Sequence, residues 1–484
     1  MPQNHNVEEL TIARFHEGIR TGQLTSRALT QWYLDRIAAH NVDGAAINAV
    51  VTVNPSALAE AEARDAAFSA SGQLTGPLHG VPILVKDQAE TAGIATSFGS
   101  AAFADYIPEA DARVVALLRA AGAVILAKTA MCDFAAGWFS SSSRTGHTRN
   151  AYDPARDSGG SSAGTGAGVS ADFGLVGVGE DTGGSIRIPA SFNNIYGLRV
   201  TTGLISRTGF SPLVHFQDTP GPMARTVEDL ATLLEVMVGY DPADEYTAVA
   251  ATEPSVGGYA AAVVDAPPMS QWCVGVLETA FGSGGDAEEV NRVVRDAIAA
   301  MADAGATIVE GLEIDGLPEW ISDTSVYRQS RSDLNRFLGS RKGPVSSFDE
   351  LNDLIPAIAA GPEQVEGDAE VTRLRLNQEH FRRLLRTLFA DSGAALIVYP
   401  TVQVPAPTHD GLRSGEYTAL TFPTNTVIAS QAGFPAVSIP VGFTESGLAV
   451  GLEVLGTPFT EQRLLQFAAA LAPLVDARRA PVLG

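Results

Sequence analysis

A lysine stands at the end of an apolar run. Val81–Val85 follows Gly80 without a polar residue, which predicts a buried strand, and Lys86 comes directly after it. Burial disfavours an ammonium group and lowers its pKa, so a lysine at such a place can act as a neutral base. Taken by itself, a lysine at a strand end more often reaches solvent or pairs with a neighbour such as Asp87.

Serine and glycine dominate a second segment, Asp157-Ser-Gly-Gly-Ser161-Ser162-Ala-Gly-Thr-Gly-Ala-Gly168. Residues this small let the backbone and the hydroxyl groups approach another group closely. The composition alone is equally compatible with a flexible loop or a tight helix contact. The whole stretch from Gly137 to Gly168 has little apolar periodicity, so we predict a loop there.

A third segment, Gly179-Glu-Asp-Thr-Gly-Gly-Ser185-Ile-Arg-Ile-Pro189, lies between a predicted strand, Leu175–Val178, and a predicted helix, Ser185–Tyr196. The first N–H groups of a helix have no partner within it and form a site for an anion. A serine at that point, preceded by two glycines, has the arrangement of a nucleophile beside its own oxyanion hole.

Together the three segments resemble the amidase signature family. Lys86 precedes Ser161 by 75 residues and Ser161 precedes Ser185 by 24, in the order and spacing of that family. The resemblance is strongest over about residues 75–230 and weak over 240–390. Ala163-Gly-Thr-Gly166 departs from the family's usual residues after the serine pair, and Ala130-Met-Cys-Asp-Phe-Ala135 departs from the commoner Asn-x-x-Glu-Phe-Ala.

The resemblance implies a role for each matching residue. Ser185 corresponds to the nucleophile, Ser161 to a bridging serine after a cis Gly160–Ser161 bond, and Lys86 to the general base. The backbone N–H groups of four residues correspond to the oxyanion hole: Thr182, Gly183, Gly184 and Ser185. Three further residues are expected to support the site: Ser162, Asp181 and Arg187.

The expected reaction is hydrolysis of an amide C–N bond. A serine hydroxyl is a weak nucleophile until a base removes its proton, and an acyl-enzyme follows from its attack. Because protonated Lys86 cannot accept that proton, activity should rise toward alkaline pH. The chemistry needs no cofactor and no metal.

The family resemblance and the alternation of strands and helices both predict an α/β fold, a three-layer α/β/α sandwich with a large mixed central sheet covered by helices. We expect one domain over residues 1–484, and its parts are a helical region at 1–70, a catalytic core at 75–230, a variable part with a helical insertion at 240–390, and closing strands and a helix at 391–484. Further predicted helices are 7–40 (two), 55–68, 112–121, 227–238, 288–304, most of 317–390, and 461–471. Further predicted strands are 46–53, 123–127, 272–277, 306–309, 395–399, 436–439 and 448–454.

Composition excludes several partners. The chain has 484 residues and a formal charge of −23, which repels nucleic acid. Its two cysteines, Cys132 and Cys273, show no zinc-binding spacing. No apolar run is long enough to span a bilayer. We therefore expect a cytoplasmic enzyme with a small-molecule amide substrate, no nucleic acid or membrane partner, and a possible homodimer.

Other functions remain open. Gly160-Ser-Ser162-Ala-Gly164 fits the nucleophile elbow of α/β-hydrolases, with His215, His380 or His409 as the base, but the polar residues before it make a poor strand. Within the resembled family, a carbamate or urea hydrolase and the amidase subunit of a glutamine-dependent amidotransferase are alternatives. A catalytically inactive scaffold is a third.

Substrate preference has the weakest sequence signal. Phe134, Ala135, Trp138 and Phe139 precede the serine-rich segment and are candidate substrate contacts, although packing explains them equally well. They favour aryl or alkyl amides over charged amino-acid amides. His147 and His215 are two further residues that could reach the site.

Overall fold

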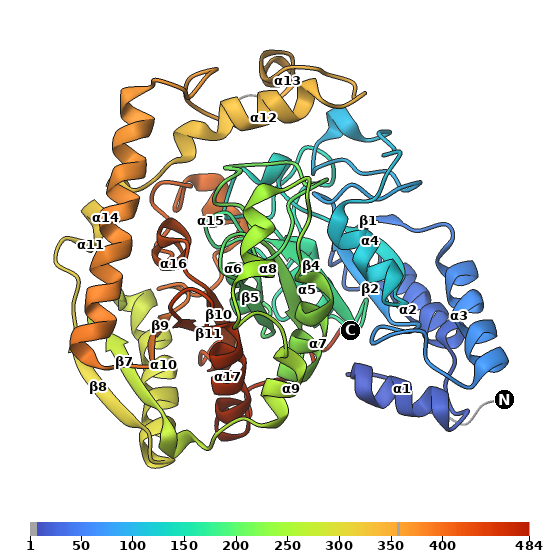
Figure 1. The fold of residues 1–484 in the computed structure, drawn as a ribbon, viewed down its shortest axis with the longest axis horizontal. Coiled ribbons are helices and arrows are strands. Elements are labelled where there is room, and N and C mark those ends of the chain that lie inside the picture. The colour runs from blue at the N-terminus through green and yellow to red at the C-terminus, as the bar shows by residue number, and fades with distance from the viewer. Residues whose placement is uncertain (1–6, 356–358, 484) are drawn as a thin grey trace.

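One large mixed sheet organises the chain in the computed structural model, which describes residues 7–355 and 359–483 (Figure 1). Its eleven strands lie in the order β1-β3-β2-β4-β6-β5-β10-β11-β9-β7-β8. The strands are β1 (Val50–Val53), β2 (Pro82–Lys86), β3 (Val124–Thr129), β4 (Val176–Glu180), β5 (Tyr196–Arg199), β6 (Pro220–Ala224), β7 (Cys273–Leu277), β8 (Thr307–Leu312), β9 (Leu396–Pro400), β10 (Ala436–Phe443) and β11 (Ala449–Leu455). Strand β2 pairs in parallel with both β3 and β4, which places the ends of β2 and β4 together.

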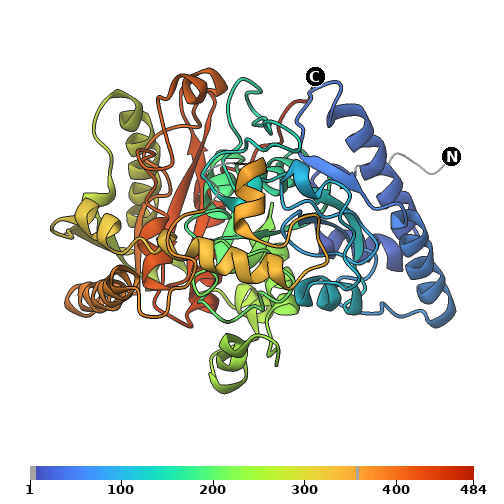
Figure 2. The ribbon, with the colours of Figure 1, turned by 90° about the horizontal axis from the view of Figure 1, so that it is seen from above.

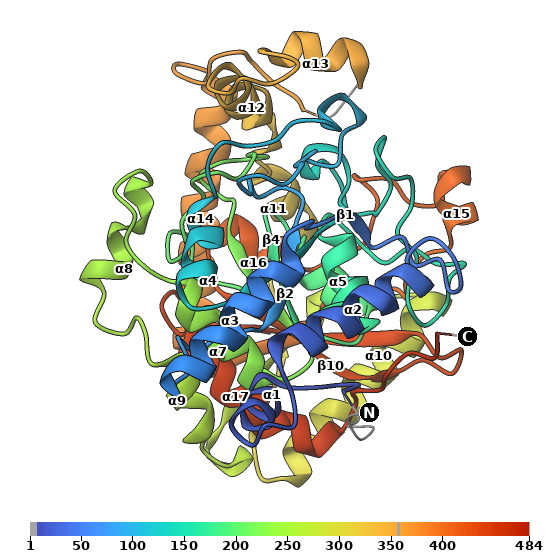
Figure 3. The ribbon, with the colours of Figure 1, turned by 90° about the vertical axis from the view of Figure 1, so that its right-hand side faces the viewer.

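Helices cover both faces of the sheet. They are α1 (Ile12–Arg20), α2 (Ser26–His40), α3 (Ala57–Ser71), α4 (Arg113–Ala120), α5 (Ala163–Ser170), α6 (Arg187–Phe192), α7 (Val227–Met237), α8 (Ala248–Thr252), α9 (Tyr259–Val264), α10 (Gly285–Asp303), α11 (Leu317–Asp323), α12 (Ser330–Gly339), α13 (Phe348–Leu354), α14 (Ala369–Ser392), α15 (His409–Ser414), α16 (Val427–Ala432) and α17 (Glu461–Val475). The three-layer α/β/α prediction is confirmed, and Figure 3 shows α16 and α17 on different sides of β10.

Strand β9 shows why both faces are covered. Leu396 and Val398 pack in the cluster that holds α10 and α17, whereas Ile397 and Tyr399 pack in the cluster that holds α14 and α16. Successive side chains of a strand point to opposite faces, so an unbroken apolar strand needs a helix layer on each side.

The predicted helical insertion is confirmed as the lobe formed by α11 to α14. Seen from above, α12 and α13 lie over the middle of the molecule (Figure 2). Phe337 of α12 packs edge-on against Phe98, with ring centroids 5.4 Å apart, so this lobe is attached to the N-terminal half of the sheet.

Three local predictions were wrong. The predicted loop up to Gly168 ends at Ser162, because α5 begins at Ala163; every residue of α5 is buried, so it shows no amphipathic period. The helix predicted for Ser185–Tyr196 is only α6, and Tyr196 begins β5. Strand β6, with its two prolines and a glycine, carried no strand signal.

Among the described residues, no helix combines the length and the apolarity that crossing a bilayer requires.

Candidate active site

Lys86 is the last residue of β2 and is completely buried. Its Nζ lies 2.8 Å from the Oγ of Ser161 and 3.1 Å from the backbone carbonyl oxygen of Glu180, at the end of the neighbouring strand β4. The peptide bond between Gly160 and Ser161 is cis, as the family resemblance implies. The parallel pairing of β2 with β4 therefore brings the lysine and the serine-rich segment to one point.

Glu180 is a second ionisable group at that point, and its side chain was missed in the sequence. Its Oε2 lies 3.5 Å from Lys86 Nζ, with both side chains fully buried. Burial lowers the pKa of Lys86, and the carboxylate opposes that shift. Burial, with Asp218 close by, raises the pKa of Glu180 to about 7. Burial thus favours the neutral form of each group, which suits a lysine acting as a base.

Asp87 does not pair with Lys86. Its Oδ1 lies 3.3 Å from the Nζ of Lys128, a buried lysine on β3, and its Oδ2 accepts a hydrogen bond from the backbone N–H of Ser97 at 2.8 Å. Lys128 also donates to the carbonyl of Ala89 at 2.6 Å. Asp87 is thereby held away from Lys86, which leaves that lysine directed toward Ser161 and Glu180.

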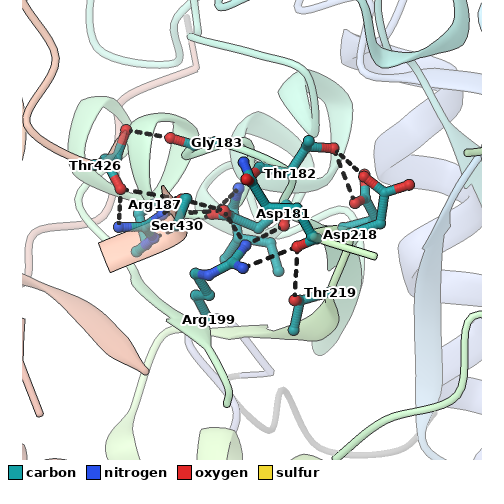
Figure 4. A network of polar contacts seen from close by, with 12 residues as sticks. Asp181, Thr182, Gly183, Arg187, Arg199, Asp218, Thr219, Thr426 and Ser430 are labelled. Carbon is teal, nitrogen blue, oxygen red and sulfur yellow. Dashed lines mark hydrogen bonds and ion pairs between the residues drawn. The ribbon is translucent and has the colours of Figure 1, made fainter. Parts of the chain in front are cut away.

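The loop between β4 and α6 is fixed through its carbonyl groups. The carbonyl of Thr182 accepts a hydrogen bond from Gln217 Nε2 at 2.7 Å, and that of Gly183 accepts one from Thr426 Oγ1 at 2.7 Å (Figure 4). In a trans peptide the N–H points opposite the preceding C=O, so these contacts direct the N–H groups of Gly183 and Gly184 to the other side. Within the described chain, no N–H of residues 182–185 donates a hydrogen bond.

Asp181 anchors the same loop from below. Its Oδ1 lies 3.0 Å from both Arg187 Nη2 and Arg199 Nη1, and its Oδ2 accepts from the N–H of Ile186 at 3.1 Å (Figure 4). Burial would raise the pKa of Asp181, but the two guanidinium groups hold it at about 2. Arg187 also donates to the backbone carbonyl of Thr426 at 2.9 Å, so it joins the loop to α16.

Ser185 lies just before α6, and its side chain is almost completely buried. Its carbonyl accepts a hydrogen bond from the N–H of Ser162 at 3.0 Å. Ser162 Oγ is engaged elsewhere, because it lies 3.2 Å from the Glu180 carbonyl oxygen and 3.3 Å from the Glu180 nitrogen. The described residues from 130 to 162 contain no strand of the sheet, so the elbow geometry that would make Ser162 a nucleophile lacks its strand.

The four candidate substrate contacts lie in different places. Trp138 is adjacent to the oxyanion-type loop, since a Cβ on Gly183 would lie 2.4 Å from its ring. Phe139 packs edge-on against Phe422, with ring centroids 5.0 Å apart. Phe134 and Ala135 are buried, the first in the cluster around Phe98 and the second in a separate apolar cluster.

The candidate histidines are away from Lys86 and Ser161. His215 donates its backbone N–H to Asp333 at 2.9 Å and lines a cavity of about 670 Å³ beside α14. His147 packs against His409, with ring centroids 4.7 Å apart. The ring of His380 packs against Trp320 at the helical lobe.

Comparison with known proteins decides the family. The description "Amidase" applies to the family that matches residues 28–465. The chain belongs to the amidase family. It is 35% identical over 508 residues to the glutamyl-tRNA(Gln) amidotransferase subunit from Ralstonia nicotianae, covering 96% of this chain and 98% of the relative. The native peptide amidase of Stenotrophomonas maltophilia superimposes with a TM-score of 0.85 at 33% identity, over 99% of each chain. A peptide amidase in complex with the competitive inhibitor chymostatin gives a TM-score of 0.86 at 32% identity, over 99% of this chain and 100% of that one.

Membership of this family makes the chain an enzyme that hydrolyses amide C–N bonds. Four groups that hold the site carried no motif in our reading of the sequence: the side chains of Glu180, Gln217, Asp218 and Thr426. Glu180 stood beside a motif and could have been questioned for that reason. Thr426 is more than 200 residues beyond Gly183, so only the folded chain places the two together.

Proposed function

We propose that this amidase cleaves small amides through Ser185, Ser161 and Lys86. The observation that carries the proposal is the 2.8 Å distance between Lys86 Nζ and Ser161 Oγ at a fully buried position. A neutral lysine in contact with a serine hydroxyl can accept a proton through it from a second serine. Ser185 is that second serine, because its backbone is hydrogen-bonded to Ser162, the neighbour of Ser161.

The steps follow from these positions. Ser185 Oγ attacks the amide carbonyl carbon while its proton passes to Ser161, whose own proton passes to Lys86 Nζ. The carbonyl oxygen becomes an oxyanion, which the N–H groups of Thr182, Gly183, Gly184 and Ser185 stabilise. Return of the proton to the leaving nitrogen breaks the C–N bond and leaves an acyl-enzyme. Water, activated by the same base, then releases the carboxylic acid.

The oxyanion role has independent support from the loop geometry. An oxyanion hole needs donors that are oriented before the reaction, so that no reorganisation accompanies charge development. The Gln217 and Thr426 side chains hold two carbonyls of this loop, and its N–H groups have no partner in the described chain. The ion pair of Asp181 with Arg187 holds the loop at its base.

Apolar or aromatic amides are the proposed substrates. Trp138 contacts the loop at Gly183, and its Nε1 donates to the carbonyl of Ala419 at 2.9 Å, which holds the ring in place. A flat apolar surface beside the reacting carbonyl favours uncharged groups over charged ones. The likeness to a peptide amidase adds peptide amides with apolar side chains to the candidates.

A substrate panel tests this function. Release of ammonia or amine from aryl amides, alkyl amides, an anilide, an apolar peptide amide, a carbamate and glutamine would be measured with the purified chain. We expect turnover of the apolar amides, at least a thousandfold loss in Ser185→Ala and Lys86→Met, and no change in a control, Ser71→Ala, at the exposed end of α3. Full activity in Ser185→Ala would refute the assignment.

A second candidate function is that of an amidotransferase subunit, which the full-length similarity to the glutamyl-tRNA(Gln) amidotransferase protein favours. It uses the same three residues but takes glutamine as the ammonia donor and works with partner chains. Glutamine hydrolysis that exceeds that of every apolar amide in the panel would favour this function over the first.

A further inference from the structure

Two histidines and an aspartate meet outside the proposed catalytic residues. His147 and Asp157 belong to the segment that leads to Ser161, and His409 is the first residue of α15. One potential ligand atom from each of the three lies within 4.8 Å of the other two. His409 Nδ1 is 3.7 Å from Asp157 Oδ2.

These imidazoles lack hydrogen-bond partners although they are enclosed. His409 is 9% exposed and Asp157 is 0% exposed. Nδ1 of His147 and both ring nitrogens of His409 are buried without a hydrogen-bond partner in the described part of the chain. Buried polar atoms are nearly always satisfied, so three such nitrogens around one carboxylate need a common partner.

We propose that His147, Asp157 and His409 bind a divalent transition-metal ion of the zinc class. Two imidazole nitrogens and one carboxylate oxygen are a ligand set that such ions accept, with water as the fourth ligand. Calcium and magnesium prefer oxygen ligands throughout and do not fit this set. The proposal does not depend on the hydrolytic mechanism, because none of the three side chains takes part in it.

The site has an approach and charges that suit neutral ligands. A cavity of about 500 Å³ is lined by His147, His409, Arg149 and Arg413, among others, and reaches both imidazoles. Burial lowers the pKa of His409 to about 4, with His147 and the arginines adding to the effect, and burial also lowers the pKa of His147. Both rings are therefore in the neutral form that binds metals. Arg413 is ion-paired with Asp410, which offsets its repulsion of a cation.

Asp157 is held in place as a metal-binding carboxylate should be. Its Oδ2 accepts from Ser140 Oγ at 2.6 Å, and its Oδ1 accepts from the N–H of Gly159 at 2.8 Å. Such outer contacts orient a ligand and increase its affinity for the ion. The ion would tie α15 to the segment that carries Ser161, so it should stabilise the folded chain by mass action.

Titration with cobalt and zinc tests the site. The full chain, freed of metal with a chelator, would be titrated with Co²⁺ and followed by visible absorption, then back-titrated with Zn²⁺. We expect saturation at one Co²⁺ per chain, the intense bands of a four- or five-coordinate ion, displacement by Zn²⁺ and a higher unfolding midpoint. Absence of saturable binding, or only the weak bands of a six-coordinate ion, would overturn the proposal.

Variants locate the ion. His147→Gln, His409→Gln and Asp157→Asn should each weaken binding by roughly tenfold or more, whereas His380→Gln, a histidine on exposed helix α14, should leave it unchanged. Each variant's fold would be checked by circular dichroism, and any one folded variant is sufficient. Undiminished binding in a folded variant of the cluster, or equal loss in His380→Gln, would overturn the assignment.

Discussion

Replacing Glu180 by glutamine should make the enzyme active at lower pH. The substitution keeps the size of the side chain and removes the negative charge 3.5 Å from Lys86 Nζ. An anion at that distance stabilises protonated Lys86, so its removal lowers the pKa of the lysine further. Because only neutral Lys86 can accept the proton of Ser161, the rising limb of kcat/KM against pH should move toward acid.

The size of the shift follows from the distance. Two full charges 3.5 Å apart interact by about 5 kcal/mol at an effective dielectric constant of 20, or about a thousandfold in the protonation equilibrium of Lys86. This is an upper value, because the pKa of Glu180 is raised to about 7 by its burial and it is only partly ionised near neutrality. The two groups titrate as a coupled pair, so we expect the limb to move by about one to two pH units.

The assay is kcat/KM for one neutral amide, measured from about pH 6 to about pH 10 with wild type, Glu180→Gln and a control, Glu288→Gln, at the exposed start of α10. The control should follow the wild-type profile. A limb that stays in place or moves toward alkaline pH in folded Glu180→Gln would refute the reasoning. A lower plateau with an unmoved limb would mean that Glu180 acts only through its 3.3 Å contact with the Thr182 hydroxyl.

Three further substitutions probe the loop between β4 and α6. Asp181→Asn should lower the free energy of unfolding by about 3–5 kcal/mol in urea, because it leaves two fully buried arginines without their shared anion. Gly184→Ala should reduce kcat by roughly a hundredfold or more in a hydrolysis assay, because the added Cβ would lie 2.0 Å from Thr426 Oγ1 at a φ of 148°. Gln378→Leu should reduce kcat by about tenfold with KM unchanged, because Gln378 Nε2 holds Gln217 Oε1 at 2.9 Å and Gln217 holds the loop.

Each of these has a matched control. Asp410→Asn removes an exposed ion pair and should cost less than about 1 kcal/mol. Gly415→Ala has a positive φ of 83° but open space around the new Cβ, so activity should be kept. Asn377→Leu removes an exposed hydrogen bond on the same helix as Gln378 and should leave kcat unchanged. Equal effects in a variant and its control would contradict the corresponding argument.

Sequence patterns predicted the elements whose signal is local. The apolar run before Lys86 is β2, and the Thr25 cap begins α2 one residue later, as expected. Helix α5 was missed because it is buried on every side: a Cβ on Gly164 would lie 2.1 Å from the carbonyl oxygen of Ala49. Small residues that permit close packing are typical of loops in a sequence, so composition alone predicted a loop.

The candidate site was predictable where motifs carry it. Lys86 and Ser161 were expected together, and the structure brings their side chains into contact. The partners that orient the oxyanion-type loop were not predictable, because Gln217 and Thr426 come from a separate loop and from the start of α16. Their contacts with the loop arise only when β4, β6 and the strands beyond them form one sheet, which no local pattern encodes.

The central claim is that Ser185 is the activated nucleophile, and covalent labelling tests it most directly. The wild type, Ser185→Ala and Ser162→Ala would be treated with a fluorophosphonate, and their intact masses recorded. We predict one adduct on the wild type, located on Ser185 by peptide mapping, and none on Ser185→Ala. An adduct that persists in Ser185→Ala but disappears in Ser162→Ala would place the nucleophile at Ser162 and contradict the account.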